Sequence, residues 1–258
     1  MGTEGHVFSL SQDFINRAVD GCVMPVLDAP PFCLDVDRIL TFCGFHRGNR
    51  RIETIIQELI ETVLPVARPK ALYRVAYVEK REGDSVYIDG VYFTSHVLRV
   101  NLEAVERIFP YAATCGTELD QIHFSPRNYV KQYYLDGIKE LALRSATHYL
   151  AQHLQKTYAL TQISRMNPGS LEDWPLSQQN ALFTLLGDVP ARIGIALTKH
   201  CVMTPIKSVS GIYFPTQIRF ESCRLCPRRL CRRRRAPYDP DVVKTYASPS
   251  IEHPPQNR

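Results

Sequence analysis

The pattern of apolar positions predicts three helices of different length. Over Ile52–Leu64 the apolar residues recur at intervals of three and four, which is the spacing of one buried helical stripe. Pro65 ends this helix. A longer helix is expected from about Asn128 to Tyr158, and a third from Ser177 to Leu186, where Gly187 stops it.

Strands are expected where the period shortens to two. These segments are Leu72–Val78, Val86–Ile88, Val91–Phe93, Tyr111–Gly116, Ile193–Leu197 and Ile212–Phe220. Asp89-Gly90 joins the second to the third, and this dipeptide favours a tight hairpin turn. Short helices are expected over 11–19, 35–42 and 103–108. Runs of strands interrupted by helices are typical of an α+β domain.

Length and composition fit one such domain with additions at both ends. Hydrophobic residues make up 45% of the 258 residues, and no apolar run approaches the roughly 18 to 20 residues that cross a bilayer. We expect an N-terminal extension over 1–32, the α+β domain over 33–222, a Cys/Arg-rich segment over 223–238 and a flexible tail over 239–258. The beginning lacks a secretory signal pattern, so a cytoplasmic location without membrane contact is predicted.

The positive charge is concentrated in one short stretch. The formal net charge is +5, yet Arg219–Arg235 alone carries +7, from eight arginines against Glu221, and the remaining residues sum to −2. Such a stretch can meet phosphate, an acidic protein surface or an anionic cofactor. The run Arg232–Arg235 would also suit nucleic acid. No nucleic-acid-binding fold and no second basic patch are recognisable, which favours an acidic protein partner or a solvated segment.

Three of the eight cysteines crowd into the same stretch. Cys223, Cys226 and Cys231 have the spacing C-x2-C-x4-C, which can direct thiolates at one metal. Disulfides are not expected in a reducing compartment. The alternatives are an iron–sulfur cluster, zinc or no metal. Cys115 and Cys201 are the candidates for a fourth ligand, although Cys115 also fits a buried small residue.

Three motifs occur in a fixed order in the second half of the chain. They are Arg165-Met-Asn-Pro-Gly-Ser170, Leu197-Thr-Lys-His-Cys-Val-Met-Thr-Pro205 and Lys207-Ser-Val-Ser-Gly-Ile-Tyr-Phe214. Together they resemble the activation domain of cobalamin-dependent methionine synthase, strongly over about 165–220 and diffusely over 33–164. The resemblance implies a free-standing relative of that domain. It also implies a single domain with a largely antiparallel, twisted sheet and flanking helices.

The resemblance further implies a function. Domains of this family bind S-adenosylmethionine and present its methyl group to inactive cob(II)alamin held by another module. An electron from a flavodoxin- or ferredoxin-type donor completes this reductive methylation. The chain would then be a reactivation protein for a cobalamin-dependent methionine synthase or a related corrinoid methyltransferase, an accessory component of that enzyme system. No catalytic side chain is expected, because the cofactors supply the chemistry and the protein supplies positioning.

Five residues are candidate contacts to S-adenosylmethionine: Arg165, Pro168, Gly169, Ser170 and Phe220. The planar guanidinium of Arg165 suits the carboxylate of the methionine moiety. Pro168-Gly169 stiffens the loop and lets backbone approach a ligand. Phe220 lies about where the family has an aromatic contact. The family has tyrosine in place of Ser170, and its acidic contact near the N-terminus has no counterpart here.

The same residues also have plainer interpretations. Arg165 could form a salt bridge, and Pro168-Gly169 could be an ordinary turn. Ser208–Gly211 could be a loop entering a strand, with Tyr213-Phe214 and Trp174 packed in the core. The departure at Ser170 therefore motivates a second hypothesis. In it, the ligand pocket has decayed and the chain is a non-enzymatic adaptor or iron–sulfur electron carrier for a corrinoid protein.

Overall fold

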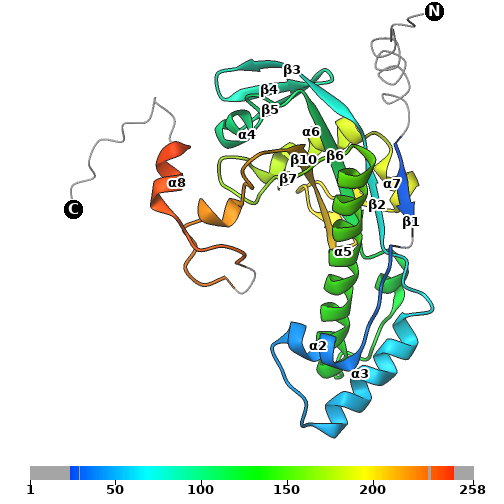
Figure 1. Ribbon diagram of the computed structural model, residues 1–258. Helices are drawn as coiled ribbons and strands as arrows, with labels where there is room; N and C mark the ends of the chain where they lie inside the picture. The colour runs from blue at the N-terminus through cyan, green and yellow to red at the C-terminus, as the bar shows by residue number, and fades with distance from the viewer. Residues whose placement is uncertain (1–23, 29, 232–233, 247–258) are drawn as a thin grey trace, which may run out of the picture.

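One antiparallel sheet occupies the centre of the molecule (Figure 1). The computed structural model describes residues 24–28, 30–231 and 234–246, so the predicted helix over 11–19 lies outside the described residues. The strands of the sheet are β1 (Val26–Asp28), β2 (Lys70–Tyr73), β3 (Ala76–Glu82), β4 (Ser85–Ile88), β5 (Val91–Thr94), β6 (Arg107–Thr114), β7 (Ile163–Met166) and β10 (Ser208–Pro215). A separate ribbon joins β8 (Ala196–Leu197) to β9 (Met203–Thr204).

The strand β6 runs through the middle of the sheet. It pairs with β10 on one side and with β2 and β3 on the other. β1 adds to β2, the hairpin β4–β5 adds to β3, and β7 adds to β10. All of these pairs are antiparallel. The predicted α+β fold with a largely antiparallel sheet is therefore confirmed.

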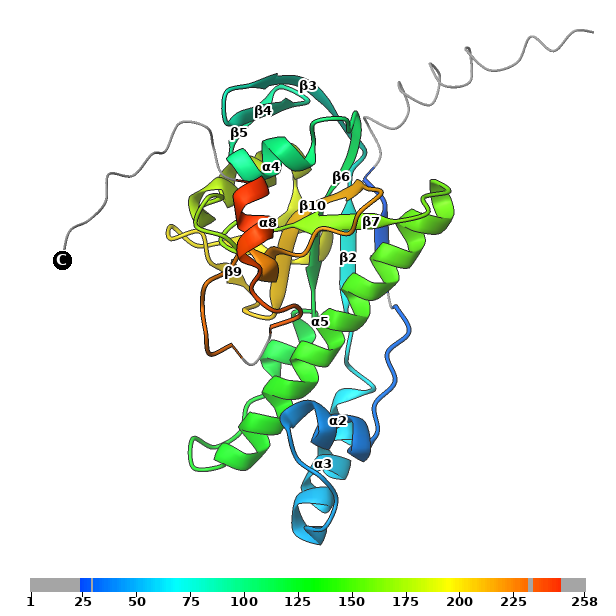
Figure 2. The ribbon, with the colours of Figure 1, turned by 60° about the vertical axis from the view of Figure 1, so that its left-hand side comes forward.

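Helices cover both faces of this sheet. The helices are α2 (Val36–Cys43), α3 (Arg50–Val63), α4 (His96–Asn101), α5 (Tyr129–Thr157), α6 (Gln179–Leu186), α7 (Val189–Ile193) and α8 (Pro240–Thr245), with 3-10 turns η1 (Glu118–Gln121), η2 (Leu176–Gln178) and η3 (Ser222–Arg224). Figure 2 shows α5 crossing the sheet and continuing beyond it to α2 and α3. α6 and α7 pack against the other face. No helix in the described part of the chain is long and apolar enough to cross a membrane.

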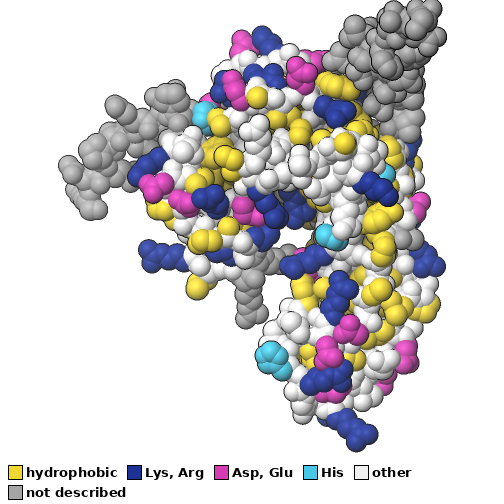
Figure 3. Space-filling view, in the orientation of Figure 1, with side chains coloured by type: hydrophobic (Ala, Val, Ile, Leu, Met, Phe, Trp, Pro, Cys, Tyr) yellow, Lys and Arg dark blue, Asp and Glu magenta, His cyan; other side chains and the backbone are white. Residues whose placement is uncertain are grey.

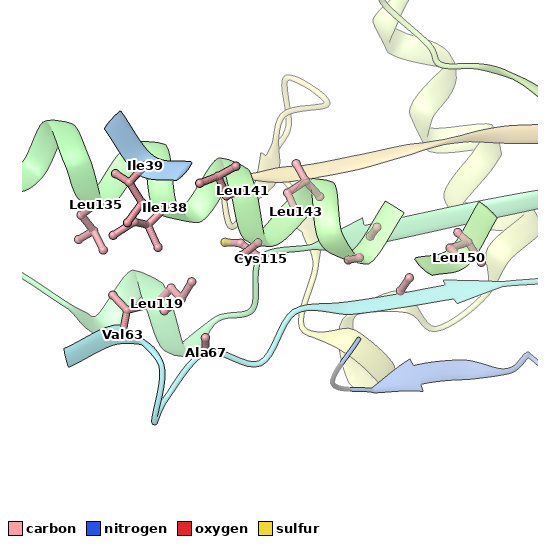
Figure 4. Packing of buried hydrophobic residues seen from close by; sticks show 14 of the residues in the cluster. Ile39, Val63, Ala67, Cys115, Leu119, Leu135, Ile138, Leu141, Leu143 and Leu150 are labelled. Atoms are coloured by element: carbon pink, nitrogen blue, oxygen red, sulfur yellow. The ribbon is translucent and has the colours of Figure 1, made fainter. Parts of the chain in front are cut away.

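The buried side chains form two cores, one on each face of the sheet. Successive strand residues point to opposite faces, so Ala113 of β6 enters the core beneath α5 while Ala112 enters the core beneath α6. Figure 4 shows part of the first core, where Ile138 of α5 lies near Ile39 of α2. This core continues past the end of the sheet, and that continuation anchors α2 and α3.

The long helices and the hairpin agree with the sequence prediction. α3 and α5 begin where asparagine side chains cap them: Asn49 accepts a hydrogen bond from Ile52 N, and Asn128 accepts one from Lys131 N. The third predicted helix corresponds to η2 and α6. Asp89 and Gly90 have φ values of 43° and 78°, which the tight β4–β5 turn requires.

The predicted strand Leu72–Val78 is divided in two by a proline on its neighbour. Lys70 faces Thr114 and Ala76 faces Ile108, so β2 and β3 keep one register along β6. Arg74 N donates to Pro110 O at 3.0 Å, but Pro110 has no N–H to return. The ladder is therefore interrupted at this point without a change of register.

Three other predicted elements are wrong in type or bounds. The helix expected over 103–108 lies earlier, as α4, because Ser95 Oγ accepts from Leu98 N and caps it. Most of the strand expected over 193–197 is absent, because Asp188 caps α7, which ends at Ile193. The strand expected over 212–220 is shifted to β10, so the Ser-Val-Ser-Gly residues lie within it.

The ends of the domain also differ from the sequence expectation. Val26–Asp28 pairs with β2, ahead of the predicted domain start at residue 33. The tail predicted to be flexible from residue 239 begins with the helix α8, which Asp239 caps through hydrogen bonds from Asp241 N and Val242 N. The other proposed boundaries stay predictions.

We expect Gly211→Ala to lower the free energy of unfolding by about 2 kcal/mol, as overpacking of a tight site does. A Cβ atom at Gly211 would lie 2.3 Å from both Met166 O and Asn167 Nδ2, so β7 and β10 would have to separate. Urea unfolding followed by circular dichroism measures this change. Ser170→Ala, which alters an exposed side chain, is the control, and equal stability of both variants would contradict the expectation.

Candidate functional site

Most of the residues predicted to contact ligand lie on or near the edge strand β7. In the described structure this strand pairs only with β10, and Arg165 faces Tyr213 across that pairing. Phe220 is also joined to β7, because its backbone N–H donates to Ser164 Oγ at 2.7 Å. An edge strand leaves backbone groups open on one side, which is where a ligand can approach.

Arg165 is held by Tyr213 on the α5 side of the sheet, and Tyr111 lies nearby. Its Nη1 donates to Tyr213 Oη at 3.2 Å, and Tyr213 Oη donates to Thr147 O of α5 at 3.4 Å. The rings of Tyr111 and Tyr213 lie 4.5 Å apart. Tyr111, followed by Tyr213 and its hydrogen bond, raises the pKa of Arg165. Burial raises the pKa of Tyr213. Arg165 therefore stays charged and Tyr213 stays neutral over the whole physiological pH range.

The remaining nitrogens of Arg165 have no hydrogen-bond partner among the described residues. They are also not among the unpaired atoms that are fully buried. A salt bridge, the plainer interpretation of Arg165, is not formed within the described chain. The geometry leaves a partly buried guanidinium that is anchored at one nitrogen and open to an anion at the others.

The loop after β7 has a fixed backbone. Asn167 Nδ2 donates to Tyr111 Oη and to Ser210 O, both at 2.7 Å. Gly169 has a φ of 79° and donates from its N–H to Trp174 O at 2.7 Å. Pro168 is buried, whereas Gly169 and Ser170 are exposed. The loop therefore presents backbone and one small hydroxyl at the surface beside β7.

Phe220 lies on the opposite face of the edge strand. It is 8% exposed and belongs to the core that contains Met166, the residue after Arg165. Its ring packs edge to face on Tyr246 at 5.7 Å, and Tyr246 Oη donates to Asn101 Oδ1 at 3.0 Å. The structure therefore does not bring the Phe220 ring and the Arg165 guanidinium onto one face. Neighbouring strand residues alternate sides, which separates them.

The C-terminal segment returns to the Arg165 side of the sheet. Glu221 contributes to the raised pKa of Arg165, and Arg235 lies close enough to oppose the rise in the pKa of Tyr213. Arg235 Nη2 and Glu221 Oε1 form an ion pair at 2.6 Å. Figure 3 shows Lys and Arg side chains gathered between this segment and α5. The face beside Arg165 is therefore cationic.

Sequence reasoning missed several members of this cluster. Tyr213 was assigned to core packing, which is confirmed by its 4% exposure, but its hydroxyl also holds Arg165. Phe214 and Trp174 are buried, as predicted. Tyr111 and Glu221 lie outside the three motifs, and Asn167 lies within the first motif but was given no role. The position of Asn167 between Arg165 and Pro168-Gly169 was the available signal.

The Cys/Arg-rich segment is organised around a guanidinium. Arg234 Nη1 donates to Cys223 O at 2.9 Å and to Ala236 O at 3.2 Å, and its Nη2 donates to Cys226 O at 3.1 Å and to Arg228 O. Backbone carbonyl groups of the two cysteines thus point at an arginine. Charge-assisted bonds of this kind can close a loop that has little apolar core.

The predicted metal site is not supported by this arrangement. Within the described residues, no group of three or more His, Cys, Asp or Glu side chains is placed to hold a metal ion. Cys223, Cys226 and Cys231 are half-buried and have free thiols, and the Cys223 Sγ accepts a hydrogen bond from Arg235 N at 3.5 Å. The spacing was interpreted as thiolate ligands of one metal, whereas the described loop is closed by a guanidinium and carbonyl oxygens.

Neither candidate for a fourth ligand joins these thiols. Cys115 is fully buried, and burial raises its pKa to about 12, which fits the small core residue that was the alternative. Cys201 lies beside α6, where its Sγ accepts from Asn180 Nδ2 at 3.2 Å. Packing of each thiol in its own surroundings keeps them apart from the C-terminal cluster.

Comparisons with known proteins agree with the motif-based resemblance. Residues 164–220 match the family described as vitamin B12 dependent methionine synthase, activation domain. Thirteen solved chains match significantly. One is described as the MetH reactivation domain bound to AdoHcy, with 15% identity, a TM-score of 0.57, and coverage of 78% of this chain and 81% of that one. No curated protein matched significantly. Residues 164–220 therefore match this activation-domain family, the chain shares the fold of the solved reactivation domain, and the predicted resemblance is confirmed.

We expect Arg234→Lys to loosen the Cys/Arg-rich loop without unfolding the domain. Lysine cannot reach four carbonyl oxygens with a planar fork, so amide exchange over residues 223–231 should rise roughly tenfold, which corresponds to about one lost charged hydrogen bond. Hydrogen–deuterium exchange with mass spectrometry measures this. Arg228→Lys, at an exposed side chain, is the matched control. Unchanged exchange in Arg234→Lys would contradict the guanidinium-centred loop.

We expect iodoacetamide at mildly alkaline pH to separate the cysteines into two classes. Cys223, Cys226 and Cys231 are half-buried and should be modified in the native protein. Cys115 should stay unmodified, because only the thiolate reacts and its raised pKa keeps it protonated. Peptide mass spectrometry gives the modified fraction at each site, and denatured protein gives the reference in which all four react. Rapid native modification of Cys115 would refute its buried position.

Proposed function

We propose that this chain binds S-adenosylmethionine and supports reductive methylation of a corrinoid cofactor held by a partner protein. The observation that carries the proposal is the position of Arg165. It lies at the start of the segment that matches the activation-domain family, and it has guanidinium nitrogens with no hydrogen-bond partner among the described residues. The corresponding solved structure is titled as bound to AdoHcy, the demethylated product.

In this proposal Arg165 binds the carboxylate of the methionine moiety. Tyr213 holds one nitrogen of the guanidinium, so little rotamer freedom is lost when the ligand binds. The fixed backbone of Pro168-Gly169 and the exposed Ser170 supply the next contacts. The rest of the methionine and ribosyl groups would follow the open edge of β7, where backbone groups are available.

In this proposal the ring of Phe220 does not stack on the ligand. Because its ring is covered by Tyr246, it contributes to the ligand site by fixing the backbone beside Ser164. The chain then relies on Arg165 and on loop backbone, and less on aromatic contacts, for its affinity. This is consistent with the serine at position 170.

The chemistry of the step belongs to its substrates. The methyl group leaves the sulfonium of S-adenosylmethionine and is received by the cobalt of a corrinoid, which a cobalamin-dependent methionine synthase or related methyltransferase holds. One electron must come from a flavodoxin- or ferredoxin-type donor. This chain contributes positioning, and its cationic C-terminal segment offers a surface for an acidic partner.

We expect Arg165→Gln to weaken binding of S-adenosylhomocysteine by roughly thirtyfold, because a charge-assisted contact to a carboxylate is lost. Isothermal titration calorimetry measures both proteins. Arg219→Gln, which removes an exposed arginine next to Phe220, is the control and should bind like the wild type.

The outcomes distinguish an error in the role of Arg165 from an error in the proposed function. If Arg165→Gln binds as tightly as wild type, the role of Arg165 is wrong. If wild-type protein binds neither S-adenosylmethionine nor S-adenosylhomocysteine, the proposed function is wrong. A positive result is then extended by anaerobic reconstitution with a corrinoid protein, S-adenosylmethionine and a reductant. The cob(II)alamin absorption should disappear only when this protein is present.

A further inference from the structure

An aromatic-walled pocket lies at the helical end of the molecule, away from β7. It has a volume of about 390 Å³ and is formed where the end of α2 meets the first turns of α3 and α5. Its lining residues are Leu40, Phe45, His46, Asn49, Ile52, Glu53, Tyr129, Val130, Tyr133 and Tyr134. Pockets of this size with mostly apolar walls and few polar groups are the usual sites for small molecules.

The walls of the pocket are fixed by contacts among the aromatic side chains. Phe45 packs edge to face on Tyr133 at 6.2 Å and is tilted against Tyr134 at 6.3 Å. Tyr133 Oη donates to Cys43 O at 3.2 Å. Nevertheless, 48% of Phe45, 46% of Tyr133 and 74% of Tyr129 stay exposed. A fixed and exposed set of rings is a preformed surface for a flat apolar molecule.

One polar group in the pocket is left without a partner. Tyr134 is 5% exposed, and burial raises its pKa, yet its hydroxyl makes no hydrogen bond to any described residue. The hydroxyl is not among the fully enclosed unpaired atoms, so it reaches the open space of the pocket. Buried tyrosine hydroxyls usually have a partner, and here a bound molecule can supply it.

The electrostatics of the pocket favour an anion. The first turns of α3 and α5 both line it, and the N-terminal ends of helices carry partial positive charge. The acid that lines the pocket, Glu53, already has partners: its Oε1 accepts from Gly48 N at 3.0 Å and its Oε2 lies 3.6 Å from Arg47 Nη1. Figure 3 shows both basic and acidic side chains on this end of the molecule.

We infer that this pocket binds a small, flat aromatic molecule that carries an anionic group. Its rings lie against Phe45 and Tyr133, its anionic group meets the N-terminal ends of α3 and α5, and Tyr134 donates a hydrogen bond to that group. The inference does not depend on the proposed function at β7, because no residue is shared between the two sites.

Two fluorescent probes that differ mainly in charge test the inference. 1-Anilinonaphthalene-8-sulfonate has fused rings and a sulfonate, and N-phenyl-1-naphthylamine lacks the sulfonate. We expect the full chain to bind the anionic probe saturably at one site, and at least fivefold more tightly than the neutral probe. Val130→Trp fills the pocket and should weaken the anionic probe at least tenfold. Val202→Trp, at a similarly exposed valine outside the pocket, should not.

A second variant keeps the test independent of folding. Tyr134→Phe removes only the hydroxyl and should weaken the anionic probe severalfold, with circular dichroism verifying that the variant is folded. Non-saturable binding, or equal binding by Val130→Trp and wild type, would overturn the pocket. Equal affinity for both probes would overturn the anionic class. A wild-type dimer on gel filtration that Val130→Trp dissociates would assign the surface to a second copy of the chain instead.

Discussion

The close approach of β10 to its two neighbours is the constraint on which the rest of the molecule depends. At Gly211 the backbone of β10 lies so near Met166 and Asn167 that no side chain fits. This contact lets β7 join the sheet as an edge strand. It also aligns Arg165 with Tyr213 and brings Asn167 to Tyr111. The candidate ligand loop is thus positioned by sheet pairing together with the hydrogen bonds of its own Asn167 and Gly169.

Sheet pairing also explains why the predicted ligand contacts lie on two different faces of the sheet. Arg165 and Met166 are adjacent in β7, so their side chains enter opposite sides of the sheet. Arg165 joins the tyrosines beneath α5, whereas Met166 and Phe220 join the other core. The C-terminal segment reaches both sides, with Arg235 near Tyr213 and Tyr246 on Phe220. A segment that lies outside the family match therefore shapes the surroundings of the site.

The cysteine-rich segment illustrates how one spacing can serve different local structures. A C-x2-C-x4-C pattern predicts a tight loop, and a tight loop leaves several carbonyl groups directed inward. Either a metal bound by thiolates or a cation bound by carbonyls can stabilise that geometry. In the described structure Arg234 occupies the inward position. The arginines that were interpreted as a surface charge thus include one structural residue, and the formal charge of the stretch overstates what is free to meet a partner.

The sequence by itself determined the helices α3, α5 and α6, the Asp89-Gly90 hairpin and the family resemblance over about 165–220, because these depend on local periodicity, turn residues and motif order. Only the tertiary structure decided the start of β10, the interruption opposite Pro110, the partners of Arg165 and the closure of the cysteine loop by Arg234. Each of these depends on a residue distant in the chain, such as a proline on a neighbouring strand or a tyrosine across the sheet. Local patterns carry no information about which distant group will lie opposite, and for that reason the fold was more predictable than its site.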